Sequence, residues 1–530
     1  MAYTGQIAQL SIGIDGLTGT NNPAQVNNNE LVQATNITYV NGTIQKESGA
    51  TKYNSSAISS GAKILGGHQW DHDGSTQREI VLTDDGTLLK DTEDAGTFGV
   101  TLKSSITIGA VAGPVFVEGG KEKAAQNRKL FVFYEGMVPQ VLAADGATTS
   151  DIATPPADWS GANEPTGGLI HSDRLWGFGN PNDPHRMYYS DINDHEVFTG
   201  SSAGSISVYP GEGQKIVGAV SFKGGLVVWK YPKGIYIINT IDVSVATWSI
   251  DRITGGIGML GSKMYEVLED DVIFMDHGGD IRLLSGVVEY GNVGTLSLSD
   301  ASEMGPLIRG MDFTYSYKWS MKYNSTLREL HIAMTGTGQT ENGQDLIIDF
   351  NRPDKARFRI NNRDTIVSMW VRLDAKGLPE LLTGDDAGFI YEMNTEARSK
   401  DGAGYEGTFQ TPHFDFSHLD PKLGVTEKNF EFLEVVAEPK GSWNLSITTI
   451  IDGAQHETLQ FSMGNTGVAL GSFVLGTNIL AGDQLTNRKR KQTGSGTRIS
   501  YVATNSGDSQ DFSMVRLYQY FQPGAEEGTG

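Results

Sequence analysis

Adjacent acidic residues are the first candidates for chemistry in this sequence. Hydrolysis of a glycoside needs two carboxyl groups on opposite sides of the bond that breaks, and Asp84-Asp85 and Asp385-Asp386 supply paired carboxylates. Both pairs stand close to glycine, as does Asp276, two residues before Gly278. An aspartate in this setting accepts hydrogen bonds from the backbone of its own turn. We therefore predict that these residues build turns and do not form a catalytic pair.

Histidines and short acidic loops offer little to a metal ion. Asp71–Ser75 begins like a calcium loop, but Leu82 stands where a bidentate glutamate should complete it. The histidine pairs His68 with His72, and His185 with His195, lack further ligands at a spacing that strands could bring together. The absence of cysteine excludes thiolate sites. We therefore expect no metal and no other cofactor.

Two glycine motifs match the letters of functional turns but not their setting. Gly256–Gly261 reads Gly-x-Gly-x-x-Gly, yet it follows no clear buried strand and opens no clear helix. Gly200–Gly204 reads Gly-x-Ser-x-Gly, but Ser205–Pro210 after it has the pattern of a strand, where a nucleophile elbow needs a helix. No Gly-x-x-x-x-Gly-Lys-Ser/Thr phosphate loop occurs. The sequence therefore predicts a protein that is not an enzyme.

One basic run stands out in an acidic chain. Arg488, Lys489, Arg490 and Lys491 are consecutive in a sequence of 41 basic and 63 acidic residues with a net charge of −22. Such a run is either a solvated loop between strands or a contact for a neighbouring subunit or another anionic partner. The overall charge opposes DNA binding, which depends on cations that displace phosphate counterions. The run is kept as a candidate contact site.

Short strands must position all of these residues. The 66 glycines are spread along the 530-residue chain between runs rich in Val, Ile and aromatic residues, a pattern typical of strands joined by tight turns. Runs such as Lys63–Trp70, Glu79–Thr83 and Thr87–Lys90 form units that recur about every 40 to 50 residues, the period of a four-stranded propeller blade. No convincing amphipathic helix of about 12 residues is visible. The chain is therefore predicted to be all-β.

Three regions are predicted along the chain. Residues 1–55 would be an N-terminal extended docking segment, and residues 56–400 a β-propeller of six or seven blades. Beyond the glycine-rich stretch 399–404, longer alternating strands such as Asn429–Val436 indicate a C-terminal β-sandwich-like domain over residues 401–530. We expect no membrane insertion, because no apolar run approaches the roughly 20 residues of a membrane helix, and no secretory signal.

Several short stretches stand out together. They are Gly16-Leu17, Asn22-Pro23, Glu30-Leu31, Ala34–Asn36 and Gly42–Gly49 at the start, His171–Trp176 with His185–Asp191, Leu226–Lys230 with Gly234–Tyr236, and Thr411–Phe416 with Lys428–Phe430. These stretches resemble the tail nozzle and hub proteins of short-tailed bacteriophages, the proteins that stabilise packaged DNA. In that family an Asn-Pro turn, an Asn-bearing strand and a glycine-marked return precede a β-propeller.

The resemblance implies a structural protein of the virion, made in the host cytoplasm. It would form a homo-oligomeric ring, a hexamer, below the portal and adaptor rings, and would contact tail fibre or tail needle proteins. The ring would retain packaged double-stranded DNA and later let it pass without sequence recognition. The alternative is a glycan-binding or glycan-cleaving propeller of the tail, in which Trp159, Trp176 and Tyr188 would stack on sugars if exposed.

Overall fold

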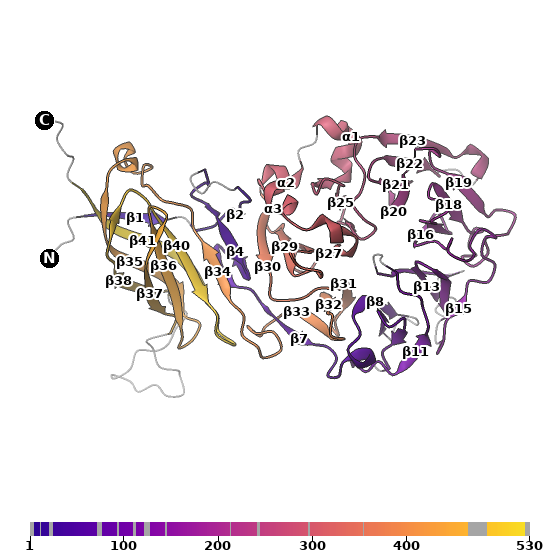
Figure 1. The fold of residues 1–530 in the computed structure, drawn as a ribbon, viewed down its shortest axis with the longest axis horizontal. Helices are drawn as coiled ribbons and strands as arrows, with labels where there is room; N and C mark the ends of the chain where they lie inside the picture. Colours follow the sequence, from indigo (N-terminus) through magenta and orange to yellow (C-terminus); the bar gives the residue numbers. More distant parts are fainter. Residues whose placement is uncertain are drawn as a thin grey trace.

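Two lobes built almost entirely of strands make up the chain (Figure 1). A computed structural model describes residues 5–10, 12–20, 25–71, 77–92, 95–109, 113–120, 128–143, 146–212, 214–240, 244–294, 297–352, 355–464 and 485–524. Within these ranges no helix is both long and apolar enough to span a membrane. The prediction of an all-β chain is confirmed.

The larger lobe is a β-propeller whose blades are antiparallel meanders. Each of the first four blades runs outward from a strand near the axis to a strand at the rim, where Figure 1 shows β11, β15, β19 and β23. These blades are β8 (Ile64–Asp71), β9 (Gln77–Thr83), β10 (Leu88–Lys90) and β11 (Val100–Lys103); β12 (Val115–Gly120), β13 (Arg128–Tyr134), β14 (Met137–Ala143) and β15 (Ser150–Asp151); β16 (Gly167–His171), β17 (Arg174–Phe178), β18 (Arg186–Tyr189) and β19 (Gly204–Ser207); and β20 (Lys215–Phe222), β21 (Gly225–Tyr231), β22 (Ile235–Asn239) and β23 (Ser249–Thr254).

Three further sheets complete the ring. They are β24 (Tyr265–Val267), β25 (Val272–Met275) and β26 (Ile281–Leu283); β27 (Ser320–Asn324), β28 (Glu329–Met334), β29 (Gln344–Asp349) and β30 (Arg357–Asn361); and β31 (Ser368–Leu373), β32 (Pro379–Gly384), β33 (Ile390–Thr395) and β7 (Gly49–Lys52). The short helices α1 (Leu284–Gly294), α2 (Leu298–Ala301) and α3 (Gly305–Arg309) follow β26, and α1 packs on β23, β25 and β26. Six blades thus have four strands and the β24–β26 sheet has three, which agrees with the predicted six or seven blades.

Glycines in the inner strands let neighbouring blades approach closely. A Cβ atom added to Gly67 in β8 would lie 2.5 Å from the Trp370 ring of β31. A Cβ atom on Gly168 in β16 would lie 2.4 Å from the Phe133 ring of β13. Any larger residue would force these large side chains out of the contact between blades. The scattered glycines therefore serve packing between blades as well as turns.

A strand from near the start of the chain closes the propeller. β7 pairs antiparallel with β33, with Thr51 opposite Glu392 and Ala50 opposite Met393. The last blade therefore joins residues 49–52 to residues 368–395. Opening the ring would require this pairing to break.

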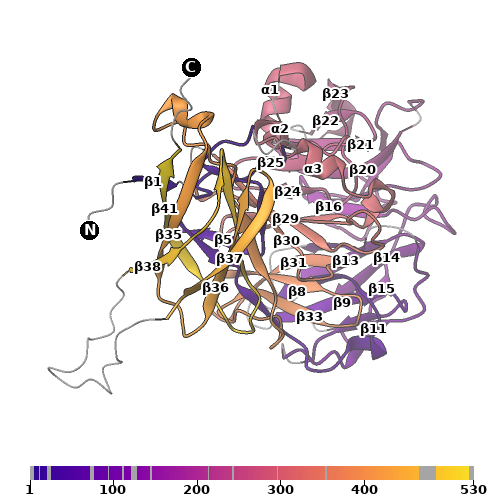
Figure 2. The same cartoon turned by 60° about the vertical axis from the view of Figure 1, so that its left-hand side comes forward.

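The smaller lobe is a two-sheet sandwich (Figure 2). One sheet has the order β38-β35-β41-β6-β5, with β1 on β41 and β39 on β35. The other runs β34-β40-β36-β37 and continues through β4 into the blade β27–β30, so that nine strands form one sheet across both lobes. The strands are β1 (Gln6–Leu10), β4 (Gln33–Thr35), β5 (Ile37–Val40), β6 (Thr43–Lys46), β34 (Gly407–Gln410), β35 (Lys428–Glu438), β36 (Asn444–Ile451), β37 (Ala454–Ser462), β38 (Thr486–Lys491), β39 (Ser495–Gly496), β40 (Ile499–Asn505) and β41 (Ser513–Pro523).

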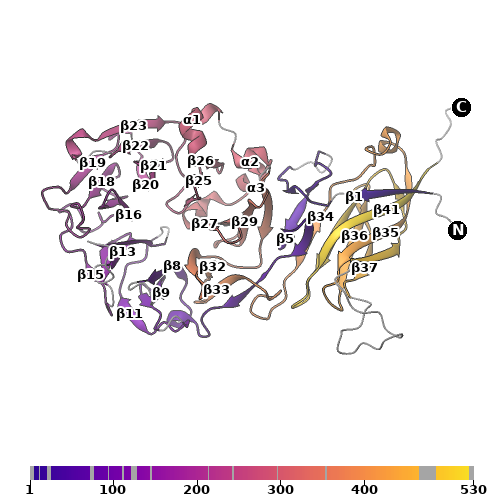
Figure 3. The ribbon, with the colours of Figure 1, turned by 180° about the vertical axis from the view of Figure 1, so that it is seen from behind.

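Residues 1–55, predicted as an extended docking segment, supply strands to both lobes. β1, β5 and β6 lie in the sandwich, β4 in the shared sheet and β7 in the last blade. A short parallel pair, β2 (Gly16–Leu17) and β3 (Glu30–Leu31), precedes β4. The segment therefore docks on its own chain, and Figure 3 shows β1 beside β41 in the sandwich lobe. Asn22-Pro23 and the C-terminal residues 525–530 lie outside the described residues.

Candidate functional site

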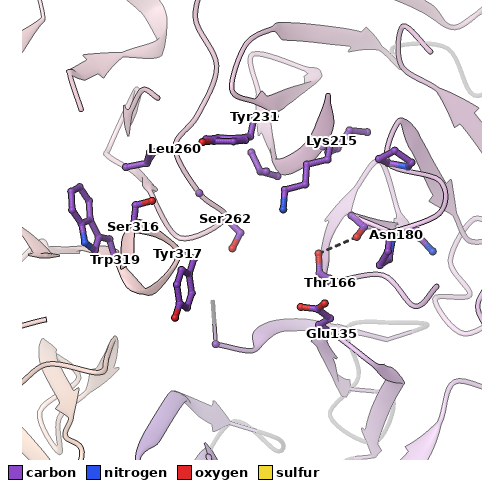
Figure 4. A pocket seen from close by; sticks show the side chains of 17 residues that line it. Glu135, Thr166, Asn180, Lys215, Tyr231, Leu260, Ser262, Ser316, Tyr317 and Trp319 are labelled. Atoms are coloured by element: carbon purple, nitrogen blue, oxygen red, sulfur yellow. Dashed lines mark hydrogen bonds between the residues drawn. The ribbon is translucent and has the colours of Figure 1, made fainter. Parts of the chain in front are cut away.

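The space along the propeller axis is the first candidate site. A cavity of about 660 Å³ opens there, and loops from several blades surround it. In Figure 4 the polar side chains of Glu135, Lys215 and Tyr317 approach this space from different blades. A second cavity, of about 460 Å³, is lined by β8, β12, β24, β27 and β31, and Ser262 borders both cavities. The two cavities therefore belong to one axial space.

Lys263 borders the second cavity. It belongs to the connection before β24, and its Nζ lies 3.5 Å from the carbonyl oxygen of Leu65 in β8, which belongs to a blade across the ring. A Cβ atom added to Gly113 would lie 2.7 Å from the same Nζ. Burial, assisted by repulsion from Lys322, lowers the pKa of Lys263 to about 7. The side chain thus reaches from one blade toward another beside the axial space.

An ion-pair cluster joins the loops near Lys263. Glu341 Oε1 lies 2.8 Å from Lys63 Nζ and 2.9 Å from Lys318 Nζ. Burial alone would raise the pKa of Glu341, but the hydrogen bonds from both lysines hold it below its ordinary value. Since Lys63 precedes β8 and Glu341 lies between β28 and β29, the cluster ties two blades together beside the axial space.

The axial space has the size of a small-molecule pocket. The first cavity, about 660 Å³, lies within the range of roughly 300–1,000 Å³ that is typical of small-ligand sites.

This cavity does not favour glycoside hydrolysis. Glu135 is the only carboxylate among the described residues that line it, whereas the reaction needs two opposed carboxyl groups. The aromatic residues considered for sugar stacking are buried, with exposed fractions of 3% for Trp159, 0% for Trp176 and 3% for Tyr188. Their rings pack between blades and present no face to a ligand.

The predicted turn aspartates serve their turns. Asp85 Oδ1 accepts hydrogen bonds from Thr83 Oγ1 at 2.6 Å and from the Thr87 amide at 3.1 Å. Asp385 Oδ1 accepts from the amide of Phe389 at 2.7 Å, and Asp276 Oδ1 from the amide of Gly278 at 2.8 Å. Burial would raise the pKa of Asp85, but the bonds from its turn hold it below its ordinary value. The prediction that these aspartates build turns is confirmed for Asp85, Asp385 and Asp276.

The histidine pairs have other partners. His185 Nδ1 lies 3.2 Å from Lys230 Nζ, and His195 Nδ1 accepts a hydrogen bond from the Gly120 amide at 2.9 Å. His68 Nε2 lies 2.9 Å from Glu118 Oε1, and its proposed partner His72 lies outside the described residues. Within the described part of the chain no group of three or more His, Asp or Glu residues is placed to hold a metal ion.

Both glycine motifs lie in connections. Gly256–Gly261 is part of the irregular segment between β23 and β24. Gly200–Gly204 leads into strand β19 and not into a helix. Neither motif therefore has the strand–turn–helix setting that nucleotide binding or a nucleophile elbow requires.

The basic run lies on a strand, and the solvated-loop interpretation is wrong. Arg488–Lys491 belongs to β38, which pairs with β35 and is the last strand of its sheet. Alternate side chains of a strand point to opposite faces. Arg488 Nη2 and Arg490 Nε donate to carbonyl groups at the end of β37, those of Gly464 at 2.9 Å and Gln460 at 3.0 Å. Lys489 and Lys491 therefore occupy the outer face of the sheet, and both are exposed.

A buried cluster of charges at the junction of the lobes escaped sequence reasoning. Arg359 in β30 binds Glu47 at 2.7 Å and Glu329 at 2.9 Å, and Arg359 is 1% exposed. His331 Nδ1 lies 2.8 Å from Asp345 Oδ2 in the same blade. A cavity of about 540 Å³ borders Glu47 and Glu329. The sequence does show charged residues alternating with apolar ones in these strands. Such alternation usually indicates that the charged side chains lie on a solvent-exposed face.

The similarity to known proteins that we find is structural. No protein-family model and no curated protein matches the chain. The computationally designed Ika8 protein is 7% identical with a TM-score of 0.36, and the match covers 65% of this chain and 100% of that chain. YCF48 bound to D1 peptide is 12% identical with a TM-score of 0.38, and the match covers 68% of this chain and 98% of that chain. These likenesses carry no argument about function, and the propeller follows from the order of the sheets.

Proposed function

We propose that this protein is a structural component of a bacteriophage virion, the nozzle or hub ring of the tail below the portal and adaptor. The supporting observation is the nine-stranded sheet that links the blade β27–β30 to the sandwich through β4. Because β4 pairs with β34 at three residues and with β30 at Ile360 opposite Thr35, we infer that the subunit acts as one elongated block. A block of this kind suits a role that depends on shape.

The ring would act by geometry and charge and not by catalysis. Copies of the block would assemble into a hexamer that contacts the portal and adaptor on one side and tail fibre or needle proteins on the other. Double-stranded DNA would pass between the subunits. The net charge of −22 keeps DNA from adhering to the wall, because binding would need cations to replace its counterions. The protein would be made in the host cytoplasm and retained in the virion.

Particle imaging of the full chain tests this proposal. We expect the purified protein, mixed with the portal and adaptor proteins of the same virus, to form rings that add to the portal–adaptor complex in negative-stain micrographs. The expected ring is sixfold, and mass photometry would give six times the subunit mass of 57.2 kDa. A monomer that does not bind the complex would overturn the proposal, and turnover or binding of a glycan by that monomer would favour a glycan-directed propeller.

A further inference from the structure

We infer that the axial space of the propeller binds a small anion, with the ammonium group of Lys263 as its principal contact. The anion would be the carboxylate or phosphate group of a small molecule. Such a site lies within one propeller and would exist whether or not the subunits form a ring.

The ammonium group of Lys263 has no close partner in the described part of the chain. Its hydrogen bond to the carbonyl oxygen of Leu65 is 3.5 Å long, whereas a good N–H···O bond measures about 2.7–3.2 Å. None of the described carboxylates forms an ion pair with it, and the neighbouring charge of Lys322 repels it. A cation withdrawn from water without a counter-ion is unfavourable. An anion beside Nζ would supply the missing partner.

A cavity of about 200 Å³ beside Lys263 is richer in cations than in carboxylates. The charged residues that line its described wall are Lys63, Lys263, Lys318, Asp84 and Glu341. Glu341 is shared between Lys63 and Lys318. Asp84 Oδ1 accepts a hydrogen bond from the Lys63 amide at 2.8 Å. With Lys263 protonated, this wall carries three positive and two negative charges, in a chain where 63 acidic residues outnumber 41 basic ones.

The second cavity, which Lys263 also borders, has a lysine whose charge is already paired. Lys322 in β27 binds Glu266 in β24. Among the described lysines that line these two cavities, Lys263 is thus the one without a carboxylate partner. A charge-assisted hydrogen bond to an anion is about twice as strong as one between neutral groups, so Lys263 would dominate the contact.

The space around Nζ is left open by glycines. A Cβ atom added to Gly113 would lie 2.7 Å from Lys263 Nζ, and one added to Gly66 would lie 3.5 Å from it. Gly113 also borders the first cavity, of about 660 Å³, which has room for the organic part of a small molecule. Ser262 precedes Lys263, and its hydroxyl points into the axial space in Figure 4. This hydroxyl would donate a second hydrogen bond to the anion.

Titration calorimetry of the full-length protein tests the site, with inorganic phosphate and with succinate as separate probes. We expect at least one of them to bind, and Lys263→Met to weaken that binding at least tenfold, because methionine keeps an unbranched side chain but removes the charge. The matched control is Lys233→Met, which removes the same charge on the exposed turn between β21 and β22 and should bind like the unmodified protein. Circular dichroism would check that both variants fold.

Acetylation of the unmodified protein gives a second readout that needs no variant. A pKa of about 7 leaves about half of Lys263 uncharged at pH 7, so acetic anhydride should modify it faster than Lys233. An anion bound at Nζ would hold the amine protonated and cover it. We expect the bound anion to slow acetylation of Lys263 severalfold and to leave that of Lys233 unchanged, as measured by peptide mass spectrometry.

The outcomes either identify the anion or exclude the site. Binding of phosphate alone would assign a phosphate group, and binding of succinate alone a carboxylate. No binding of either probe at about 10 mM, or equal binding by the two methionine variants, would overturn the inference. If Lys263→Met does not fold, an acetylation rate of Lys263 that neither probe changes would overturn it. The ring is tested separately by mass photometry, so either proposal can fail without the other.

Discussion

Arg359 binds two buried carboxylates and holds them together. It lies between Glu47 of the N-terminal segment and Glu329 of β28, and all three are less than 10% exposed. Removing one partner of a buried ion pair leaves an uncompensated charge and costs about 3–5 kcal/mol. We expect Arg359→Met to lower the free energy of unfolding by about this amount in urea titrations. Arg516→Met, on an exposed strand position, is the control, and an equal, small effect of both would contradict the prediction.

His331 should make stability depend on pH above its ordinary pKa of 6.5. Burial would lower its pKa, but the carboxylates of Asp345 and Glu329 raise it above the ordinary value of 6.5. A raised pKa in the folded state means that protonation stabilises the fold, fully below pH 6.5 and decreasingly as the pH rises through the folded value. We expect the free energy of unfolding to fall over that range in the unmodified protein and to change less in His331→Gln. Exposed His418→Gln should behave like the unmodified protein, and unchanged pH dependence in His331→Gln would refute the assignment.

Sequence reasoning at the residue scale found local features and missed distant ones. Turn aspartates such as Asp85 were predictable because their partners lie within two residues. The basic run was visible, but its division between two faces depends on the pairing of β38 with β35. Lys263 could not be singled out, because its partner Leu65 is 198 residues away. Arg359 was missed because a charged residue that alternates with apolar ones gives the same sequence pattern whether its side chain is buried or exposed.

At the scale of elements, β7 is the strand on which closure of the propeller depends. A Cβ atom at Gly49 would lie 2.3 Å from the carbonyl oxygens of both Ala397 and Ser399. Neither backbone oxygen can move without disturbing the last blade. Gly49→Ala should therefore destabilise the protein by about 1–3 kcal/mol. The change in the free energy of unfolding would be calculated from the lower thermal midpoint and the unfolding enthalpy. Gly255→Ala, where the nearest atom is 3.5 Å away, should have little effect, and similar midpoints for the two variants would exclude steric strain at β7.

Inner strands of the blades were more predictable than rim strands, although Ser205–Pro210 did indicate the rim strand β19. The run Lys63–Trp70 corresponds to β8, and Glu79–Thr83 lies within β9, because these strands are seven or eight residues long and β9 is buried from Glu79 onward. The rim strand β15 has two residues, too few to show the alternation of apolar and polar residues that indicates a strand. α1 to α3 also passed unnoticed, since the longest has 11 residues and the other two are shorter still. The route of residues 1–55 through both lobes is set by pairing with strands more than 300 residues away, which a local pattern does not encode.

For the whole molecule, the shared sheet predicts that propeller and sandwich unfold together. β4 joins them, with Thr35 opposite Ile360 of β30 and Ala34 opposite Phe409 of β34. Ala34 is 1% exposed, and proline there would remove a main-chain donor from the interior of the sheet. In Ala34→Pro we expect the slowest-exchanging amides of β29 and of β36 to exchange faster by the same factor in hydrogen-exchange mass spectrometry. Gln9→Pro, in strand β1 at the margin of the sandwich, should leave the amides of β29 protected. Faster exchange in β36 alone in the Ala34 variant would show that the lobes are independent, and a stiff block could then no longer be the basis of a ring that works by shape.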